Sequence, residues 1–157
     1  MKIKDAAADF LVNKRVAVTG VSRNPKEHGA NVVYRRFRER GYEVFAVNPN
    51  AETVEGNRCY PDLAAIPGGV EAVVIATRAD RAEETMRECA ELGIRHVWMH
   101  RGPGEGSVSE TAAEYGRAHG IAVISGGCPC MFDGTADFGH KVMRAVLTLS
   151  GNVPREV

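Results

Sequence analysis

The residues with the clearest chemical potential follow a short apolar run near the N-terminus. The run at 16–18 is followed by Gly20, a polar loop at 21–25 and a helical pattern that starts near Gly29. A strand, a glycine turn and a helix N-terminus in this order bring main-chain N–H groups together, and the helix dipole favours an anion there. The pattern predicts a cradle for the phosphates of a nucleotide. Because many α/β proteins have a glycine here and bind nothing, the other loops have to identify the ligand.

Two arginines add positive charge on either side of this turn. Arg23 lies in the loop itself, and Arg78 follows the third apolar run of the chain. Guanidinium groups suit a ligand with several phosphates. Thr19, Ser22, Asn24 and Asn48 supply further polar contacts. Either arginine alone would be interpreted as a solvated rim residue, but their convergence on one turn favours phosphate binding.

Two other groups could carry chemistry. Cys128 and Cys130 form a C-x-C pair, for which zinc would need two further ligands, and His100 and His140 are the candidates. The alternative is that both cysteines pack as small apolar residues. His100, next to Arg101, is either an acid–base group or a polar rim residue. We assign no metal site and no catalytic residue, since neither a Ser-His-Asp spacing nor paired carboxylates occur at these loops.

Alternating apolar runs and amphipathic stretches predict the elements that position these residues. Strands are expected at 15–20, 43–47, 72–76, 96–99 and 121–124. Helices are expected at 3–12, 29–40, 81–92 and 133–149, and a further helix is expected to end at about 119. Asp80 is the expected N-cap of the helix at 81–92, and Ser107 or Ser109 is the expected N-cap of the helix that ends at about 119. Between 51 and 70 we expect a turn at 54–57, an extended piece at 58–60 and a brief helix opening at 61–63. The tail at 151–157 is expected to be loose.

This alternation predicts one α/β domain over 1–157, with a core at about 13–149. Its sheet is Rossmann-like, a doubly wound parallel five-stranded sheet with helices on both faces. We expect the strand order 3-2-1-4-5, with the switch point between the first and fourth strands. The loops at 20–25, 48–50, 77–80, 100–106 and 125–130 then share the carboxyl edge, where open α/β sheets bind ligands.

Dinucleotide binding is the first hypothesis for such an edge. The NAD fingerprint G-x-G-x-x-G is broken here, because Ser22 and Pro25 occupy its second and third glycine positions. Asn48-Pro49 follows the second strand, where an acid would hold the ribose. No Gly-Lys-Ser/Thr occurs, which argues against a Walker-type ATPase. An NAD(P)-binding oxidoreductase remains an alternative.

Composition excludes several classes of protein. The 157 residues are 44% hydrophobic and 25% charged with zero formal net charge, so no general attraction to nucleic acid or anionic membranes is expected. No apolar run approaches the roughly 20 residues that span a bilayer, and 1–15 lacks the pattern of a signal peptide. We therefore expect a cytoplasmic protein. Its four cysteines do not form a small disulfide framework.

A set of motifs in fixed order resembles the CoA-binding protein family over about 13–145. The motifs are V-x-V-x-G-x-S-x-N-P at 16–25, G-Y-x-V-x-x-V-N-P at 41–49, G-x-x-C-Y-P-x-L at 56–63, V-x-x-V-V-I-A at 70–76, G-I-x-x-V-W-M at 93–99 and G-C-P at 127–129. The family's fold is similar to the N-terminal CoA-binding domain of the succinyl-CoA synthetase alpha subunit and of ADP-forming acyl-CoA synthetases.

The resemblance implies that coenzyme A lies along the carboxyl edge. Its phosphate and pantetheine-side groups would meet Gly20, Val21, Ser22, Arg23, Asn24 and Pro25. Val47, Asn48 and Pro49 would flank the adenine or its ribose, and Ala76, Thr77 and Arg78 would line the other wall. The synthetases carry a lysine shortly after the proline of the second strand. This chain has Asn50-Ala51 there, and Arg23, Arg78 or Arg81 could supply the cation for the 3′-phosphate instead.

We therefore expect a non-catalytic, nucleotide-binding module for CoA or an acyl-CoA. The synthetases also need a domain with a phosphorylated histidine and a nucleotide-grasping part, so ligase activity is not expected of this chain. A CoA-binding subunit that acts with a separate synthetase partner is an alternative, and a homodimer is left open. A CoA thiol could also form a mixed disulfide with the C-x-C pair.

Overall fold

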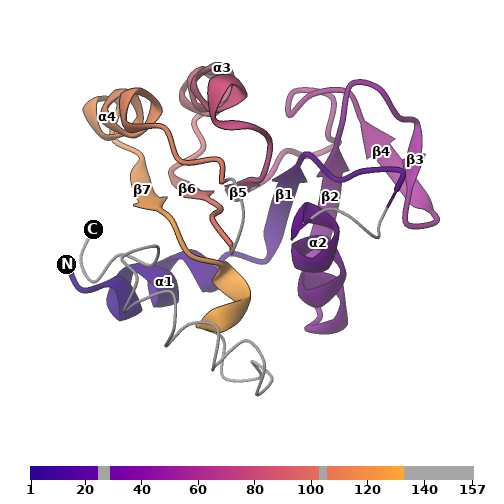
Figure 1. Cartoon of the computed structure of the whole chain (residues 1–157), viewed down its shortest axis with the longest axis horizontal. Coiled ribbons are helices and arrows are strands. Elements are labelled where there is room, and N and C mark those ends of the chain that lie inside the picture. The colour runs from indigo at the N-terminus through magenta and orange to yellow at the C-terminus, as the bar shows by residue number, and fades with distance from the viewer. Residues whose placement is uncertain (25–28, 103–105, 133–157) are drawn as a thin grey trace.

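The computed structural model describes residues 1–24, 29–102 and 106–132 (Figure 1). In chain order its elements are α1 (Ile3–Leu11), β1 (Arg15–Thr19), α2 (Gly29–Glu39), β2 (Glu43–Val47), β3 (Thr53–Val54), β4 (Asn57–Tyr60), β5 (Ala72–Ile75), α3 (Ala79–Glu91), β6 (His96–Met99), α4 (Glu110–Ala118), β7 (Ala122–Ser125) and the 3₁₀ turn η2 (Pro129–Met131). They form a single α/β domain, as predicted.

The described strands form a sheet of order β3-β4-β2-β1-β5-β6-β7, in which only the β3–β4 pair is antiparallel. The expectation of five strands is therefore slightly off, and the predicted order 3-2-1-4-5 is wrong. The third predicted strand, β5, pairs with β1 instead of β2. A short hairpin made by β3 and β4 occupies the place beyond β2, where β4 pairs with β2 in parallel.

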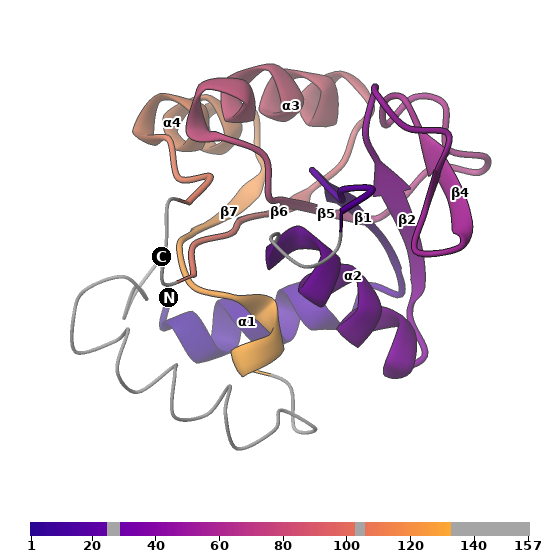
Figure 2. The same cartoon turned by 45° about the vertical axis from the view of Figure 1, so that its right-hand side comes forward.

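Among the described residues, two helices cover each face of the sheet (Figures 1 and 2). α1 and α2 pack with Val16 and Val18 of β1, whereas α3 and α4 pack on the opposite face with Ala17. Because β1 and β5 are neighbours and are followed by helices on opposite faces, the switch point lies between them. Within the described part of the chain, no helix is long and apolar enough to cross a membrane.

The helix at α1 belongs to the core. Phe10 is 1% exposed and meets the Trp98 ring edge to face, with the ring centroids 5.4 Å apart. The Trp98 indole N–H donates to the Gly126 carbonyl at 2.9 Å, so its polar end is satisfied as well. These contacts tie the start of the chain to β6 and to the loop that follows β7.

Most predicted bounds agree with the structure within two residues, and Ser109 caps α4 as expected, accepting a hydrogen bond from the Ala112 N–H. Two local predictions are wrong. Residues 61–68 form bends and turns rather than a brief helix. Arg78, not Asp80, occupies the N-cap of α3. The predicted helix at 133–149 and the tail lie outside the described residues.

Candidate functional site

The loops after β1, β2 and β5 contain the predicted ligand-binding residues. Because these strands are parallel, their loops leave the same edge of the sheet. The first loop holds Gly20, Val21, Ser22, Arg23 and Asn24, the second follows Val47 with Asn48 and Pro49, and the third holds Ala76, Thr77 and Arg78. Pro25 lies outside the described residues.

Gly20 is the point where all three loops meet. Its N–H donates to the Val47 carbonyl at 3.0 Å. Its φ is +79°, and a Cβ added there would lie 2.6 Å from the Ala76 carbonyl oxygen. The Ala76 N–H in turn donates to the Thr19 hydroxyl at 3.2 Å. Only glycine fits this turn, because a side chain would collide with the main chain of the neighbouring loop.

Asn48 joins the first two loops. Its side-chain N–H₂ donates to the Val21 carbonyl at 3.0 Å, and its side-chain oxygen accepts from the Asn50 N–H at 2.9 Å. Val21 and Val47 are buried, so their side chains belong to the core. Only their main-chain groups are therefore placed at the carboxyl edge where the ligand is expected. The sequence pattern alone did not reveal that Asn48 bonds within the protein.

The two arginines differ in their surroundings. Arg23 is exposed in the loop after β1. Arg78 is 83% exposed and lies 3.4 Å from the Asp80 carboxylate, an ion pair that solvent weakens. Since β1 and β5 are neighbours, both arginines extend from loops on either side of the switch point of the sheet. An anionic ligand there would replace water around Arg23 and compete with Asp80 for Arg78.

His100 follows β6 and approaches the start of α2. A Cβ added at Gly29 would lie 3.2 Å from the His100 Cε1 atom, and the side chain is half-buried. Burial lowers the pKa of His100 to about 4, so the ring is neutral at pH 7. It therefore brings a hydrogen-bonding group to this edge without a positive charge.

Two hydroxyl groups at the same edge are available to a ligand. Thr77 Oγ1 and Ser125 Oγ are buried and have no hydrogen-bond partner within 1–24, 29–102 and 106–132. The Thr77 carbonyl, in contrast, accepts a hydrogen bond from the Ser107 hydroxyl. Buried polar groups are normally paired, so an unpaired hydroxyl at the carboxyl edge of the sheet is typical of a position that a ligand or water fills.

A hollow of about 750 Å³ lies next to the loop after β2. It is lined by Pro49, Asn50, Ala51, Glu52, Thr53, Arg58, Cys59 and Pro61. Its volume is within the usual range for small-molecule sites. Arg58, which sequence reasoning missed, brings a guanidinium whose carbon lies 5.2 Å from the centre of the Tyr60 ring.

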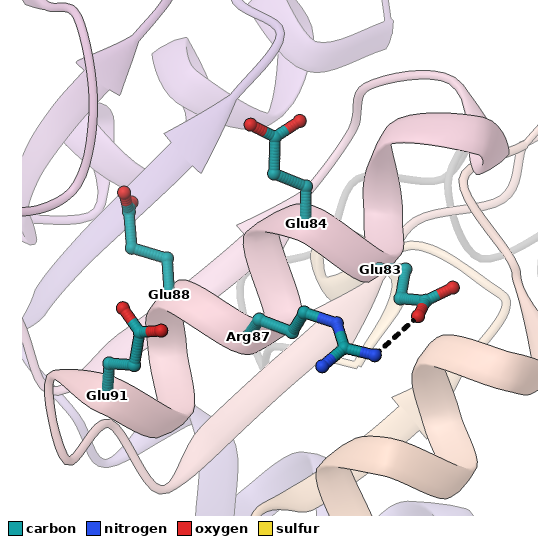
Figure 3. A pocket seen from close by; sticks show the side chains of 5 residues that line it. All are labelled: Glu83, Glu84, Arg87, Glu88 and Glu91. Carbon is teal, nitrogen blue, oxygen red and sulfur yellow. Dashed lines mark hydrogen bonds and ion pairs between the residues drawn. The ribbon is translucent and has the colours of Figure 1, made fainter.

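A second hollow, of about 480 Å³, runs along α3 and is lined by Glu83, Glu84, Arg87, Glu88 and Glu91 (Figure 3). Arg87 bonds to Glu83 at 2.8 Å. Glu88 accepts a hydrogen bond from the Leu63 N–H, and burial raises the pKa of its carboxyl. Four carboxylates around one cation would repel a polyphosphate, so this hollow does not suit the predicted ligand.

The cysteines are buried thiols. A hydrogen bond with Cys130 and burial raise the pKa of Cys128 well above its ordinary value, and burial raises the pKa of Cys89 to about 12. Protonated thiols are poor nucleophiles and poor metal ligands. Within the described residues no three His, Cys, Asp or Glu side chains gather as a metal site, and His140 lies outside them.

Sequence reasoning also missed Asn31 of α2, which contacts the first loop, and Glu55 of the β3–β4 turn, which contacts Asn31. The signal for Asn31 was a polar residue among the apolar positions that face inward on α2. The signal for Glu55 was a two-residue Glu-Gly turn between short extended pieces.

Comparisons with known proteins identify the family of the chain. Residues 14–134 match the family model described as CoA binding domain. The ADP-forming acetate–CoA ligase II of Archaeoglobus fulgidus is 34% identical over 125 residues, which cover 74% of this chain and 18% of the ligase. The alpha subunit of the corresponding Pyrococcus furiosus ligase is 33% identical over 90 residues, 57% of this chain and 20% of the subunit. The chain thus spans about a fifth of these relatives.

Among solved structures, a hypothetical protein from Pyrococcus horikoshii superposes with a TM-score of 0.73 at 25% identity. The match covers 82% of this chain and 91% of that protein. The fold is therefore shared along most of both chains.

Proposed function

Because this chain belongs to the CoA binding domain family, we propose that it binds coenzyme A or an acyl-CoA at the carboxyl edge of its sheet. The switch point between β1 and β5, where we place the binding crevice, carries the proposal. There the Gly20 turn touches the main chain of Ala76, and two exposed arginines flank the turn. A ligand with a diphosphate fits such a site, because the main chain can approach it closely and the guanidinium groups offset its charge.

The proposed orientation follows from the hollows and charges around this crevice. The diphosphate lies on Gly20, Val21, Ser22, Arg23, Asn24 and Pro25, with Arg78 opposite. The adenosine extends past Val47, Asn48 and Pro49 into the hollow that Pro49 lines. The pantetheine arm passes Ala76, Thr77 and Arg78 on the β5 side, where Thr77 Oγ1 has no partner in the described part of the chain.

A second candidate function is supported by the names of the relatives. Both ligases are described as ADP-forming acetate–CoA ligases, and one of them is a subunit. The chain would then present CoA to a separately encoded synthetase partner. An assay for ADP formation from acetate, CoA and ATP tests this, because the partner would have to be added before any product forms.

Isothermal titration with CoA tests the proposal. The wild-type chain should bind CoA, and the double variant Arg23→Ala/Arg78→Ala should bind it at least about tenfold more weakly, since hydrogen bonds to charged groups are lost. The variant Arg87→Ala/Arg117→Ala removes the same charge from two ion-paired positions away from this edge and should keep the wild-type affinity. Equal affinities in both double variants would exclude the two arginines from the site.

A further inference from the structure

Asn31 of α2 holds the main chain of the loop after β1. Its side-chain oxygen accepts a hydrogen bond from the Ser22 N–H at 2.8 Å, and its N–H₂ donates to the Ser22 carbonyl at 2.8 Å. The residue is fully buried. One side chain therefore satisfies both main-chain groups of Ser22, in the middle of the loop that the proposed function assigns to the diphosphate.

The remaining hydrogen of the Asn31 amide points to Glu55. The Asn31 N–H₂ donates to the Glu55 carboxylate at 2.9 Å, and Arg35 bonds the same carboxylate oxygen at 2.8 Å. A carboxylate can only accept hydrogen bonds, so it requires the N–H₂ end of the amide on its side. Glu55 thus reinforces the amide orientation in which Ser22 is bonded twice.

Glu55 achieves this from a backbone conformation that glutamate rarely adopts. Its φ is +51° and that of Gly56 is +74°, which are the values of a two-residue type I′ hairpin turn. Asn, Asp or Gly is preferred at the first of these positions, because other side chains crowd the backbone there. A glutamate at this position is therefore unfavourable for the turn itself, and its contact with Asn31 explains why the strain is kept.

The same hairpin lines the hollow beside Pro49. Thr53 of β3 and Arg58 and Cys59 of β4 contribute to its wall. The turn between these strands reaches Asn31, and Asn31 reaches Ser22. A single hydrogen-bonded chain therefore connects the wall of the hollow to the loop after β1.

We propose that Asn31 and Glu55 are positioning residues, which hold the loop at 20–24 in the conformation that receives the ligand diphosphate. The inference rests on the proposed function for the identity of the ligand. It assigns a functional reason to a buried amide and to a strained glutamate, neither of which touches the ligand.

Glu55→Asn separates this role from a purely structural one. Asparagine suits the turn but is too short to reach Asn31. The variant should unfold at or above the wild-type temperature and yet bind CoA about fivefold more weakly or worse, because a hydrogen bond that orders the loop is lost. Amide exchange at Ser22 should be faster. Glu55→Gln keeps a carbonyl acceptor at full length and should bind within about twofold of wild type.

Arg35→Gln is the matched control, since it removes the other partner of Glu55 and leaves the contact with Asn31. It should retain both CoA affinity and slow exchange at Ser22. Wild-type affinity in Glu55→Asn, or equal losses in Glu55→Asn and Glu55→Gln, would overturn the inference while the proposed function stands. Failure of the wild-type chain to bind CoA would overturn both.

Discussion

Gly20 and Ala76 are in main-chain contact across the switch point of the sheet: a Cβ on Gly20 would lie 2.6 Å from the Ala76 oxygen and 2.9 Å from its carbonyl carbon. The contact exists because β1 and β5 are adjacent strands, so the loops that follow them leave the sheet side by side. It places the main chain of two loops, rather than side chains, at the floor of the proposed CoA crevice.

Gly20→Ala is expected to damage both the fold and the site. The substitution combines a clash with the Ala76 main chain and an unfavourable φ of +79°. Together these should lower the free energy of unfolding by about 3 kcal/mol or more and abolish CoA binding. Chemical denaturation measures the first effect and titration with CoA the second.

Gly93→Ala is the control that measures the cost of a positive φ without a clash. Gly93 also has a positive φ, of +73°, but a Cβ there meets nothing within 4 Å. Gly93→Ala should lower the free energy of unfolding by about 1 kcal/mol and leave CoA binding intact. Similar losses in the two variants would show that the contact with Ala76 is unimportant.

The five predicted strands and the first four predicted helices follow from apolar periodicity and glycine stops, and their positions agree with the structure within two residues. The order of the strands in the sheet could not be predicted from these patterns. Ala72, Val73, Val74 and Ile75 of β5 are all fully buried, and a strand that is apolar on both faces can pair with β1 or with β2. The deciding feature is the hairpin, whose β3 has only two residues.

The ligand edge was predictable because glycine and polar residues follow each strand. The hydrogen bonds between residues of that edge could not be predicted from the sequence. The Asn48 amide bonds to Val21 and Asn50, and these contacts within the protein could not be predicted from spacing. Arg58 was not considered, because its proximity to Pro49 depends on the pairing of β4 with β2. Such relationships come from tertiary packing, which spacing along the chain does not encode.

Arg58→Ala is predicted to impair recognition of the 3′-phosphate of CoA. Arg58 lines the hollow beside Pro49 in which we place the adenosine, whereas Arg81 is paired with Glu84 at 3.9 Å on α3. Affinity for CoA should fall about tenfold, since a charged hydrogen bond is lost, and affinity for dephospho-CoA should stay the same.

Arg81→Ala serves as the comparison and should leave both affinities unchanged. An equal loss for CoA and dephospho-CoA in Arg58→Ala would mean that the side chain acts elsewhere than on the 3′-phosphate.

His100 should make the fold sensitive to acid. Its pKa is about 4 in the folded state, whereas the pKa of an exposed histidine is 6.5. Between these pH values the unfolded chain binds a proton at His100, whereas the folded chain does not. The free energy of unfolding therefore has its full value above about pH 7 and decreases as the pH falls through 6.5 toward 4. The free energy of unfolding that is lost over this pH range is roughly 2–3 kcal/mol.

The variant His100→Gln should lose less stability than the wild type over this window, as followed by chemical denaturation at several pH values. Parallel curves for the two proteins, or an NMR titration of the His100 Cε1 proton near pH 6.5, would show that the histidine is not buried in its neutral form.

The cysteines are predicted to be unreactive in the native protein. Cys59, Cys89, Cys128 and Cys130 are all at most 5% exposed, and burial raises the pKa of Cys89 to about 12. An aromatic disulfide reagent at pH 7.5 should modify the thiols only as the chain opens, and all four should react in denaturant. Rapid modification of native Cys128 or Cys130 would contradict this prediction and support a mixed disulfide with CoA at the C-x-C pair.

The most direct measurement is thermal unfolding of the wild-type chain with CoA, acetyl-CoA, NAD, NADP and ATP, each in excess. A ligand that binds only the folded state must raise the midpoint, by an amount equivalent to about 2.7 kcal/mol at a hundredfold excess over Kd. CoA or acetyl-CoA should raise the midpoint, whereas NAD and NADP should leave it unchanged. A rise with NAD or NADP and none with CoA would refute CoA binding and make the chain an oxidoreductase candidate.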